Sequence, residues 1–479
     1  MKVLMIALSA VFISACSSSL PSNISVSTDS QLNTNTQLPP QGKMVTAEEF
    51  RRDFNQLKEL LDSTHPEPNF TMNLVNVKSK IDELASQLNE PISQLKAWQH
   101  MAQLNPYFND GHMAIFYPLL NQDFNQHKAS GGTVFPVKVR IDEFNRVFID
   151  TLEHEGVGLK YGQQIKSING VPAAQVSHEI VSRMHGDSIA HRAALASDRF
   201  EKMYWLMNGD PRKYQIEVIE PNQTKKHLLA GKQVKEKQNE PEITDFLSRK
   251  LLDNNIGYLR IDRFYYAPHH EQAFFNFIEE TWLEFNKAEV QDVIIDVRAN
   301  PGGTDHYWQL GIAPYVAKDA FSFFSKYKIR LTERNLKLGP VTGELGTILE
   351  GPYNQLIPVS GKEKLKIPGK AYLLMGPLSY SSTVLFLTAF QDSGQAVIAG
   401  QRSGVRSCTT GRIHSFELTG SKLEVTVPTL IFTRAAGEAN CHEPIEPDLV
   451  LSTETIEPID VVERLAQMVH LQRVNLTGE

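Results

Sequence analysis

The chain has 479 residues, of which 41% are hydrophobic and 22% charged, and it carries a formal net charge of −7. This length exceeds what one hydrophobic core ordinarily supports, so two or three domains are expected. Basic residues are mixed with acidic ones along the sequence, which excludes the basic stripe that a nucleic-acid-binding domain needs. We therefore expect a globular protein without a nucleic-acid partner.

Residues 1–15 are typical of an export signal, because Lys2 precedes a short apolar run that is too short to span a bilayer comfortably. The run ends in the letters I-S-A-C, which resemble the lipobox of bacterial lipoproteins and imply lipidation of Cys16. Ser17 resembles the outer-membrane sorting signal. We therefore expect a lipid anchor in the outer membrane of a bacterial cell envelope, facing the periplasm. An ordinary signal peptide followed by an incidental cysteine is the alternative.

Three cysteines are present, Cys16, Cys408 and Cys441. If Cys16 is lipidated, the other two form an even pair in an oxidising compartment, where a disulfide between them is expected. The sequence has no zinc-binding spacing such as C-x-x-C, so no metal site is expected.

The N-terminal half divides by composition. Residues 16–43 are rich in Ser, Asn, Thr, Gln and Pro, which predicts a flexible tether. A small helical domain is expected at 44–118. Its first helix begins after Thr46 and ends before Pro66, because a capping pattern precedes apolar residues at helical spacing. Further helices are expected at 75–88 and 91–104, followed by a D-G-H turn that ends at His112 and leads into a short strand.

Residues 130–235 are expected to form a small β-rich module. Alternating apolar residues predict strands at 134–141 and 147–149, and a third strand ends in the turn signal Asn169-Gly170 before a helix. This pattern resembles the G-x-x-I-x-x-I-N-G core of PDZ domains, which hold a peptide C-terminus at a sheet edge. A PDZ-like module is therefore expected. Another small β-rich domain with an Asn-Gly hairpin is the alternative.

Residues 241–470 alternate between strand and helix patterns, which is typical of an α/β layer domain. The expected strands are 257–261, 290–297, 371–375 and 396–400, and the expected helices are 274–283 and 382–390.

Three segments of this domain carry candidate chemistry. The strand at 290–297 runs into Pro301-Gly302-Gly303, where adjacent glycines allow backbone N–H groups to approach a ligand. Ser381 and Ser382 stand at an expected helix start, where the helix dipole and free N–H groups stabilise an oxyanion. Taken alone, these serines could equally be helix caps. The third segment, 396–406, is a strand that ends in a glycine-containing loop.

The order of these segments resembles the tail-specific (C-terminal-processing) protease family, which also includes the tricorn core and interphotoreceptor retinoid-binding protein. The shared elements are D-x-R-x-N-P-G-G, a Ser-rich helix start and Q-D-x-G, and the resemblance covers about 44–455. It implies an α/β fold with a crotonase-like ββα catalytic domain at 241–470. It also implies a serine-type endopeptidase that cleaves peptide or protein substrates through an acyl-enzyme, without a metal or an organic cofactor.

The family pattern S-A-S-E-I-F falls without gaps on residues 381–386, so the resemblance implies Ser381 as the nucleophile. A slip of one residue would make Ser382 the nucleophile instead. The backbone N–H groups of Gly302 or Gly303, together with that of Ser382, would hold the oxyanion.

The general base departs from the commoner bacterial pattern, in which a Lys follows the third strand. Arg406 stands at the matching position, and an arginine cannot accept a proton from serine. Tricorn-like members instead use a His from an N-terminal D-G-H turn, which His112 matches. Activity should then fall in acid with an apparent pKa of roughly 6 to 7. An ordinary core or surface histidine is the alternative.

A third group should orient the histidine. Tricorn-like members place a Glu near the end of the domain, which implies Glu443, with Glu438 or Asp110 as alternatives.

Two other functions stay open from the sequence. The missing Lys is compatible with a non-catalytic ligand- or peptide-binding lipoprotein on the same scaffold. A different hydrolase ranks lower, because no serine lies in a G-x-S-x-G elbow. No feature of the sequence indicates the oligomeric state or the cleavage preference.

Overall fold

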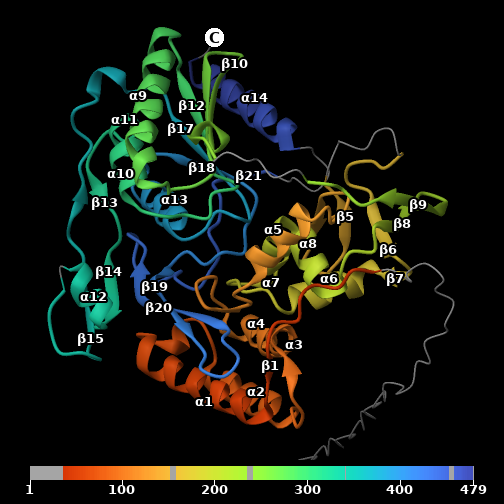
Figure 1. The fold of residues 1–479 in the computed structure, drawn as a ribbon. Helices are drawn as coiled ribbons and strands as arrows, with labels where there is room; N and C mark the ends of the chain where they lie inside the picture. The colour runs from red at the N-terminus through yellow and green to blue at the C-terminus, as the bar shows by residue number, and fades with distance from the viewer. Residues whose placement is uncertain (1–35, 151–157, 235–240, 340, 452–457, 478–479) are drawn as a thin grey trace, which may run out of the picture. The chain divides into compact units, whose positions relative to one another are not determined.

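The structure is a computed structural model that describes residues 36–150, 158–234, 241–339, 341–451 and 458–477 (Figure 1). Cys16 and the expected signal segment lie outside these residues. None of the described helices is long and apolar enough to cross a membrane.

The end of the expected tether is packed against the folded chain. Gln37 exchanges two backbone hydrogen bonds with Asp210, at 3.0 and 2.9 Å, and the carbonyl of Gln41 accepts from the Leu95 N–H at 3.1 Å. A tether that begins at Cys16 would therefore end before Gln37 rather than at residue 43.

The N-terminal helices follow the predicted pattern. Helix α1 begins with a capping box in which the Thr46 hydroxyl accepts from the Glu49 N–H and the Glu49 carboxylate accepts from the Thr46 N–H. It ends at Thr64, because the proline after His65 disfavours helical backbone at that residue. The elements of this segment are β1 (Met44–Val45), α1 (Ala47–Thr64), α2 (Leu74–Ser86), β2 (Ile92–Ser93), α3 (Gln94–Met101), α4 (Asn105–Phe108) and β3 (Ala114–Phe116).

The 130–235 module contains an antiparallel sheet of order β4-β5-β6-β8-β9, with β7 paired to β6. Asn169-Gly170 forms the predicted two-residue hairpin turn between β6 and β7. Helix α5 (Leu120–Ala129) precedes the module, whose elements are β4 (Val139–Ile141), β5 (Val147–Ile149), β6 (Gln164–Ile168), β7 (Val171–Pro172), α6 (Ala173–Val181), α7 (Ile189–Asp198), α8 (Phe200–Asn208), β8 (Lys213–Glu220) and β9 (Gln223–Ala230).

The helical segment and this module share one hydrophobic core, although the sequence patterns suggested separate domains. Phe54 and Trp98 from the helices, Phe135 and Trp205 from the module, and Val425 from the C-terminal segment are all buried in it. The two segments therefore contribute side chains to the same core, in which they pack together.

The C-terminal segment is built on a six-stranded sheet of order β10-β11-β12-β17-β18-β21, as the predicted α/β class requires. Strand β10 is antiparallel to β11 and the other neighbours are parallel. Helices α9 and α13 pack on one face and α14 on the other (Figure 1), which explains why β12 and β17 are buried along their whole length. The bounds are β10 (Leu247–Leu252), β11 (Ile256–Ile261), α9 (Glu271–Lys287), β12 (Asp292–Asp296), α10 (His306–Gly311), α11 (Ala313–Val316), β17 (Ala371–Met375), α13 (Ser382–Asp392), β18 (Val397–Gly400), β21 (Leu449–Val450) and α14 (Pro458–Thr477).

A second sheet, of order β15-β14-β20-β19, was not expected from the sequence patterns. Its strand β20 also pairs with β3, with Thr426 opposite Ala114, and so attaches the chain that follows His112 to the C-terminal segment. The remaining elements are β13 (Phe321–Ser322), β14 (Lys326–Arg330), α12 (Glu333–Leu338), β15 (Ile348–Pro352), β16 (Leu356–Ile357), β19 (Thr409–Glu417) and β20 (Glu424–Thr433).

Candidate active site

Ser381 occupies a strained turn between β17 and α13. Its φ of 56° and ψ of −121° are rare for a residue with a side chain and are typical of functional sites. This strand-turn-helix geometry is that of a nucleophile elbow, although the G-x-S-x-G letters are missing. A Cβ on Gly302 would lie 2.7 Å from the Ser381 Cβ, so only glycine allows the two turns to pack this closely.

The neighbouring Ser382 has a different environment. Its Oγ donates to Asp305 Oδ1 at 2.5 Å and accepts from Trp308 Nε1 at 3.1 Å, and the residue is buried. Ser381 Oγ instead lies 2.9 Å from His112 Nε2. The geometry therefore favours Ser381 over Ser382 as the nucleophile.

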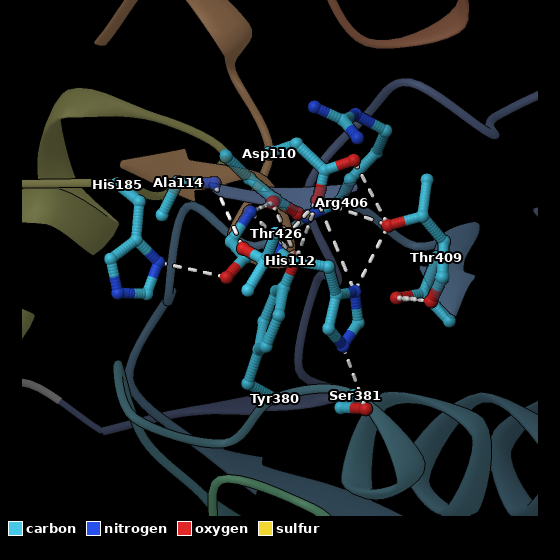
Figure 2. Close-up of polar contacts among 12 residues, drawn as sticks. Asp110, His112, Ala114, His185, Tyr380, Ser381, Arg406, Thr409 and Thr426 are labelled. Atoms are coloured by element: carbon cyan, nitrogen blue, oxygen red, sulfur yellow. Dashed lines mark hydrogen bonds and ion pairs between the residues drawn. The ribbon is translucent and has the colours of Figure 1, made fainter. Parts of the chain in front are cut away.

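His112 reaches Ser381 from 269 residues earlier in the chain. The Asp110 carboxylate accepts from the His112 N–H at 2.7 Å and closes a tight turn, while β3 holds the following residues against β20. Figure 2 shows the imidazole between Ser381 and the Asp110 side, with the Tyr380 ring beside it. A Cβ on Gly111 would lie 2.5 Å from the Tyr380 ring, so this turn also requires a glycine.

A threonine connects the histidine to a carboxylate. His112 Nδ1 lies 2.9 Å from Thr410 Oγ1, which lies 3.0 Å from each oxygen of Asp110, whereas Nδ1 and the nearer Asp110 oxygen are 3.9 Å apart. An ionised carboxylate only accepts, so Thr410 donates to Asp110 and must accept from Nδ1–H. This assignment leaves Nε2 unprotonated and able to accept from Ser381.

The structure does not bring Glu443 to this site. Its side chain is exposed, and toward the described residues it makes only backbone hydrogen bonds, to Asn440 and Ser407. The alternative Glu438 is also exposed and pairs with Lys326 at 2.8 Å. Asp110, the other alternative, is the carboxylate at the site. The implied Glu443 is therefore corrected, because the hairpin β19–β20 places a threonine and not the 441–446 loop beside His112.

Thr410 was missed, since nothing in its sequence context distinguishes it from any other strand hydroxyl. Asp187 was also missed. It lies in the loop before α7 of the 130–235 module and contacts the turn before His112 through the Gly111 N–H at 2.9 Å. No sequence motif marks it.

Burial lowers the pKa of His112 to about 4, and the neighbouring His191 and Arg406 act in the same direction, whereas Asp187 opposes them. The imidazole is therefore neutral at neutral pH. Burial raises the pKa of Asp110 to about 6, and the nearby Asp187 adds to this rise. The expected apparent pKa of roughly 6 to 7 for His112 assumed a solvated ring. Its burial overturns that assumption.

Arg406 acts on the turn that precedes His112. Its guanidinium donates to the Asn109 carbonyl and lies 5.7 Å from the centre of the Phe70 ring, and its backbone N–H donates to Asp187 at 3.1 Å. Arg406 is thus placed to position this turn. Its guanidinium is permanently charged, so it can donate hydrogen bonds but cannot act as a base.

The hydrogen bonds within the protein show which of the candidate N–H groups are free to bind an oxyanion. Gly302 donates its N–H to Asn300 Oδ1 at 2.9 Å, so this group is occupied. The N–H groups of Gly303 and Ser382 donate to no residue in the part of the chain that the structure describes. These two N–H groups are the pair available to an oxyanion. The N–H of Gly302, which the sequence offered as an alternative to that of Gly303, is used within the turn instead.

Cys408 and Cys441, the pair singled out from the sequence, form a disulfide with a Cα–Cα distance of 4.6 Å. The Cys408 N–H also donates to the Cys441 carbonyl at 3.1 Å. The link therefore ties the start of β19, two residues before Thr410, to the 434–446 loop.

Comparison with known proteins bears on this site. Residues 255–451 match Peptidase family S41. That stretch is less than half of the chain, and it includes Ser381, the Gly302-Gly303 turn and Arg406 but not His112. Comparison with curated proteins gives no match.

Among solved structures, mature CPAF has a similar fold. The complex of mature CPAF with lactacystin has a TM-score of 0.66 and 13% sequence identity, over 90% of this chain and 99% of that chain. A second structure of mature CPAF has a TM-score of 0.66 and 14% sequence identity, over 90% of this chain and 98% of that chain. The photosystem II D1 C-terminal processing protease has a TM-score of 0.45 and 14% sequence identity, over 87% of this chain and 96% of that chain. The S41 match supports a serine peptidase, and the likeness to CPAF extends the shared fold beyond the matched segment. Neither distinguishes the Ser-Lys branch from the tricorn-like branch.

Proposed function

We propose that this protein is a serine endopeptidase of the tail-specific type that cleaves peptide or protein substrates, with Ser381 as nucleophile and His112 as general base. The observation that carries the proposal is the 2.9 Å contact between Ser381 Oγ and His112 Nε2. The proton assignment through Thr410 supports it, because Nε2 is then the basic nitrogen.

In the acylation step, Ser381 Oγ attacks the substrate carbonyl carbon as its proton passes to His112 Nε2. A C–O bond forms, and the carbonyl oxygen becomes an oxyanion that accepts from the N–H groups of Gly303 and Ser382. The imidazolium is stabilised by Asp110 through Thr410.

Collapse of the tetrahedral intermediate breaks the C–N bond, and the Nε2 proton moves to the leaving amine. Water then attacks the acyl carbon and gives its proton to Nε2. Breakdown of the second intermediate returns that proton to Ser381 Oγ and releases the carboxylic acid product. These reaction steps need no metal or organic cofactor.

The site supports the tricorn-like, His-dependent branch over a degenerate Ser-Lys dyad. Arg406 occupies the position of the dyad lysine, and its side chain bonds to the Asn109 carbonyl rather than to Ser381. His112 alone among the described bases contacts the nucleophile.

The test is labelling with a fluorophosphonate, in which Ser381 Oγ bonds to phosphorus and fluoride leaves. Hydrolysis of fluorescent casein is measured alongside. Labelling should map to Ser381 and be lost in Ser381→Ala and, by several orders of magnitude, in His112→Ala. Ser393→Ala, a matched serine at the other end of α13, should label like the parent. A parent protein that does not label would favour the binding-protein alternative.

The branch has its own test. Arg406→Lys combined with His112→Ala should stay inactive if the site is His-dependent. Activity in that double variant would instead identify a Ser-Lys site, and activity in His112→Ala alone would require another base.

Three finer points belong to the same proposal. The 130–235 module is PDZ-like and presents substrate, which its antiparallel sheet and following helix α6 support. The C-terminal domain is crotonase-like, and the chain is exported and anchored through Cys16, as the I-S-A-C ending supports.

A further inference from the structure

We infer that Asp187, which belongs to the 130–235 module and not to the catalytic segment, is a positioning residue that assembles the active site. It holds the turn before His112, the turn before Ser381 and the Arg406 loop in one arrangement. This inference rests on the proposed function and identifies a residue that positions the groups of that same site.

Asp187 accepts hydrogen bonds from three segments that are remote from one another in sequence. Its Oδ1 accepts from the Gly111 N–H at 2.9 Å and from the Tyr380 hydroxyl at 2.8 Å, and its Oδ2 accepts from the Arg406 N–H at 3.1 Å. Gly111 precedes His112, and Tyr380 precedes Ser381. One carboxylate thus holds the residue before the base and the residue before the nucleophile.

His185 strengthens the same connection. Arg199 donates to His185 Nε2 at 3.0 Å, so the ring proton must lie on Nδ1, which donates to the Gly111 carbonyl at 2.8 Å. Both backbone polar groups of Gly111 are therefore held by the 130–235 module. The 130–235 module therefore helps to position His112 from outside the segment that carries Ser381, together with β20, Arg406 and the Tyr380 hydroxyl of that segment, which also accepts from the Gly111 N–H at 2.9 Å.

The surroundings keep Asp187 in its ionised form. Burial alone would raise the pKa of Asp187, but the neighbouring Arg406 and His191 lower it below its ordinary value. His191 Nδ1 also accepts from the Asp187 N–H at 3.2 Å. Arg192 on α7 and the carboxylate of Asp110 also interact electrostatically with Asp187.

Tyr380 is a permanent donor to this carboxylate. Burial and the two neighbouring carboxylates, Asp187 and Asp110, raise the pKa of Tyr380 well above its ordinary value, so its hydroxyl stays protonated. Its ring packs against the rings of both His112 and His191, with centroid distances of 4.8 and 4.7 Å. A shift of Asp187 therefore moves the ring that packs on the base.

The experiment compares Asp187→Asn with the full-length parent. An asparagine has one acceptor oxygen, so at least one of the three donors loses its hydrogen bond to residue 187. The fluorophosphonate labelling rate at Ser381 and kcat on a casein-derived peptide should fall about 10- to 100-fold, with little change in KM, because a misplacement of about 1 Å is enough for such a loss.

The pH profile supplies a readout that a purely structural role would not move. The Asp187 charge raises the pKa values of both Asp110 and His112, so its removal should shift the acid limb of the labelling rate to lower pH.

Asp210→Asn is the matched control. Asp210 is a buried aspartate of the same module that also accepts three hydrogen bonds, from the Thr133 N–H, the Thr133 hydroxyl and the Arg212 N–H. This variant should lower Tm and leave the labelling rate per folded molecule and the pH profile unchanged.

The outcomes distinguish the role of Asp187 from the proposed function itself. A parent that labels at Ser381, with an Asp187→Asn variant that labels equally fast and with the same pH profile, overturns the role of Asp187 alone. A parent that does not label overturns the proposed function. If Asp187→Asn does not fold, Tyr380→Phe decides, because it removes one donor and keeps the ring. It should label several-fold more slowly, and an unchanged rate would contradict the inference.

Discussion

At the residue scale, the link between base and carboxylate is a hydroxyl. Thr410 Oγ1 is within 3.0 Å of both His112 Nδ1 and Asp110, and it must donate to one and accept from the other. The orientation of a single O–H group therefore determines which imidazole nitrogen carries the proton.

Thr410→Val keeps the side-chain shape and removes this hydroxyl. His112 Nδ1–H then loses its acceptor, so the ring is no longer held in the tautomer that accepts from Ser381. We expect kcat to fall by about 10²- to 10⁴-fold with KM nearly unchanged, as measured on a peptide substrate. Thr410→Ser should retain most of the activity. Equal activity in the Val and Ser variants would show that the hydroxyl has no role.

The pH dependence follows from the same three residues. As pH falls, Asp110 takes up a proton at about 6, whereas His112 stays neutral down to about 4. A protonated Asp110 can donate to Thr410, which can then donate to Nδ1 and leave the ring proton on Nε2. That tautomer cannot accept from Ser381.

We therefore expect the labelling rate at Ser381 to fall as pH drops through about 6, because of Asp110 and not His112. Asp110→Asn should have a lower rate and an acid limb that moves toward 4. An unchanged limb in Asp110→Asn would assign the titration to another group.

At the scale of elements, the hairpin β19–β20 determines the site. Strand β19 carries Thr410, and β20 pairs with β3, so the hairpin brings Thr410 beside the D-G-H turn whose His112 contacts Ser381. The Cys408–Cys441 disulfide lies at the open end of this hairpin.

Replacing both cysteines by serine should lower the free energy of unfolding by about 3–4 kcal/mol, since the link closes a loop of 33 residues in the unfolded chain. Chemical denaturation measures the loss. The labelling rate should also fall, because Thr410 follows Cys408 by two residues. Thiol counting on the unfolded, unreduced protein is the direct check, and two free thiols from this pair would contradict the disulfide.

At the scale of the whole molecule, the expected lipid anchor is the feature on which location depends. Cys16→Ala removes the acylated thiol implied by the I-S-A-C ending. We expect this variant to leave the membrane fraction or to remain unprocessed, as shown by fractionation and by the mass of the N-terminus. Ser18→Ala, next to the anchor but outside the motif, should fractionate like the parent. A Cys16→Ala variant that stays with the membrane would require another anchor.

Local patterns predicted much of the fold. The capping box at Thr46, the Asn-Gly hairpin and the buried strands of the α/β sheet were predictable because each depends on neighbouring residues and on apolar periodicity. The second sheet was missed, because β3, β14 and β20 pair across more than a hundred residues and carry no local signal of their partners.

The sequence by itself, through its residues and the family that its motifs resemble, predicted Ser381 as nucleophile with Ser382 as the alternative, the glycines beside it, the exclusion of Arg406 as a base and His112 as the base. These follow from residue chemistry and from the order of motifs. Only the tertiary structure placed Thr410 and Asp110, and not Glu443, beside His112, and brought Asp187 to the site from another module. The physical reason is that a hydrogen bond needs its partners within about 3 Å. For residues hundreds of positions apart, only the packing of the shared core and the pairing of β3 with β20 bring them that close.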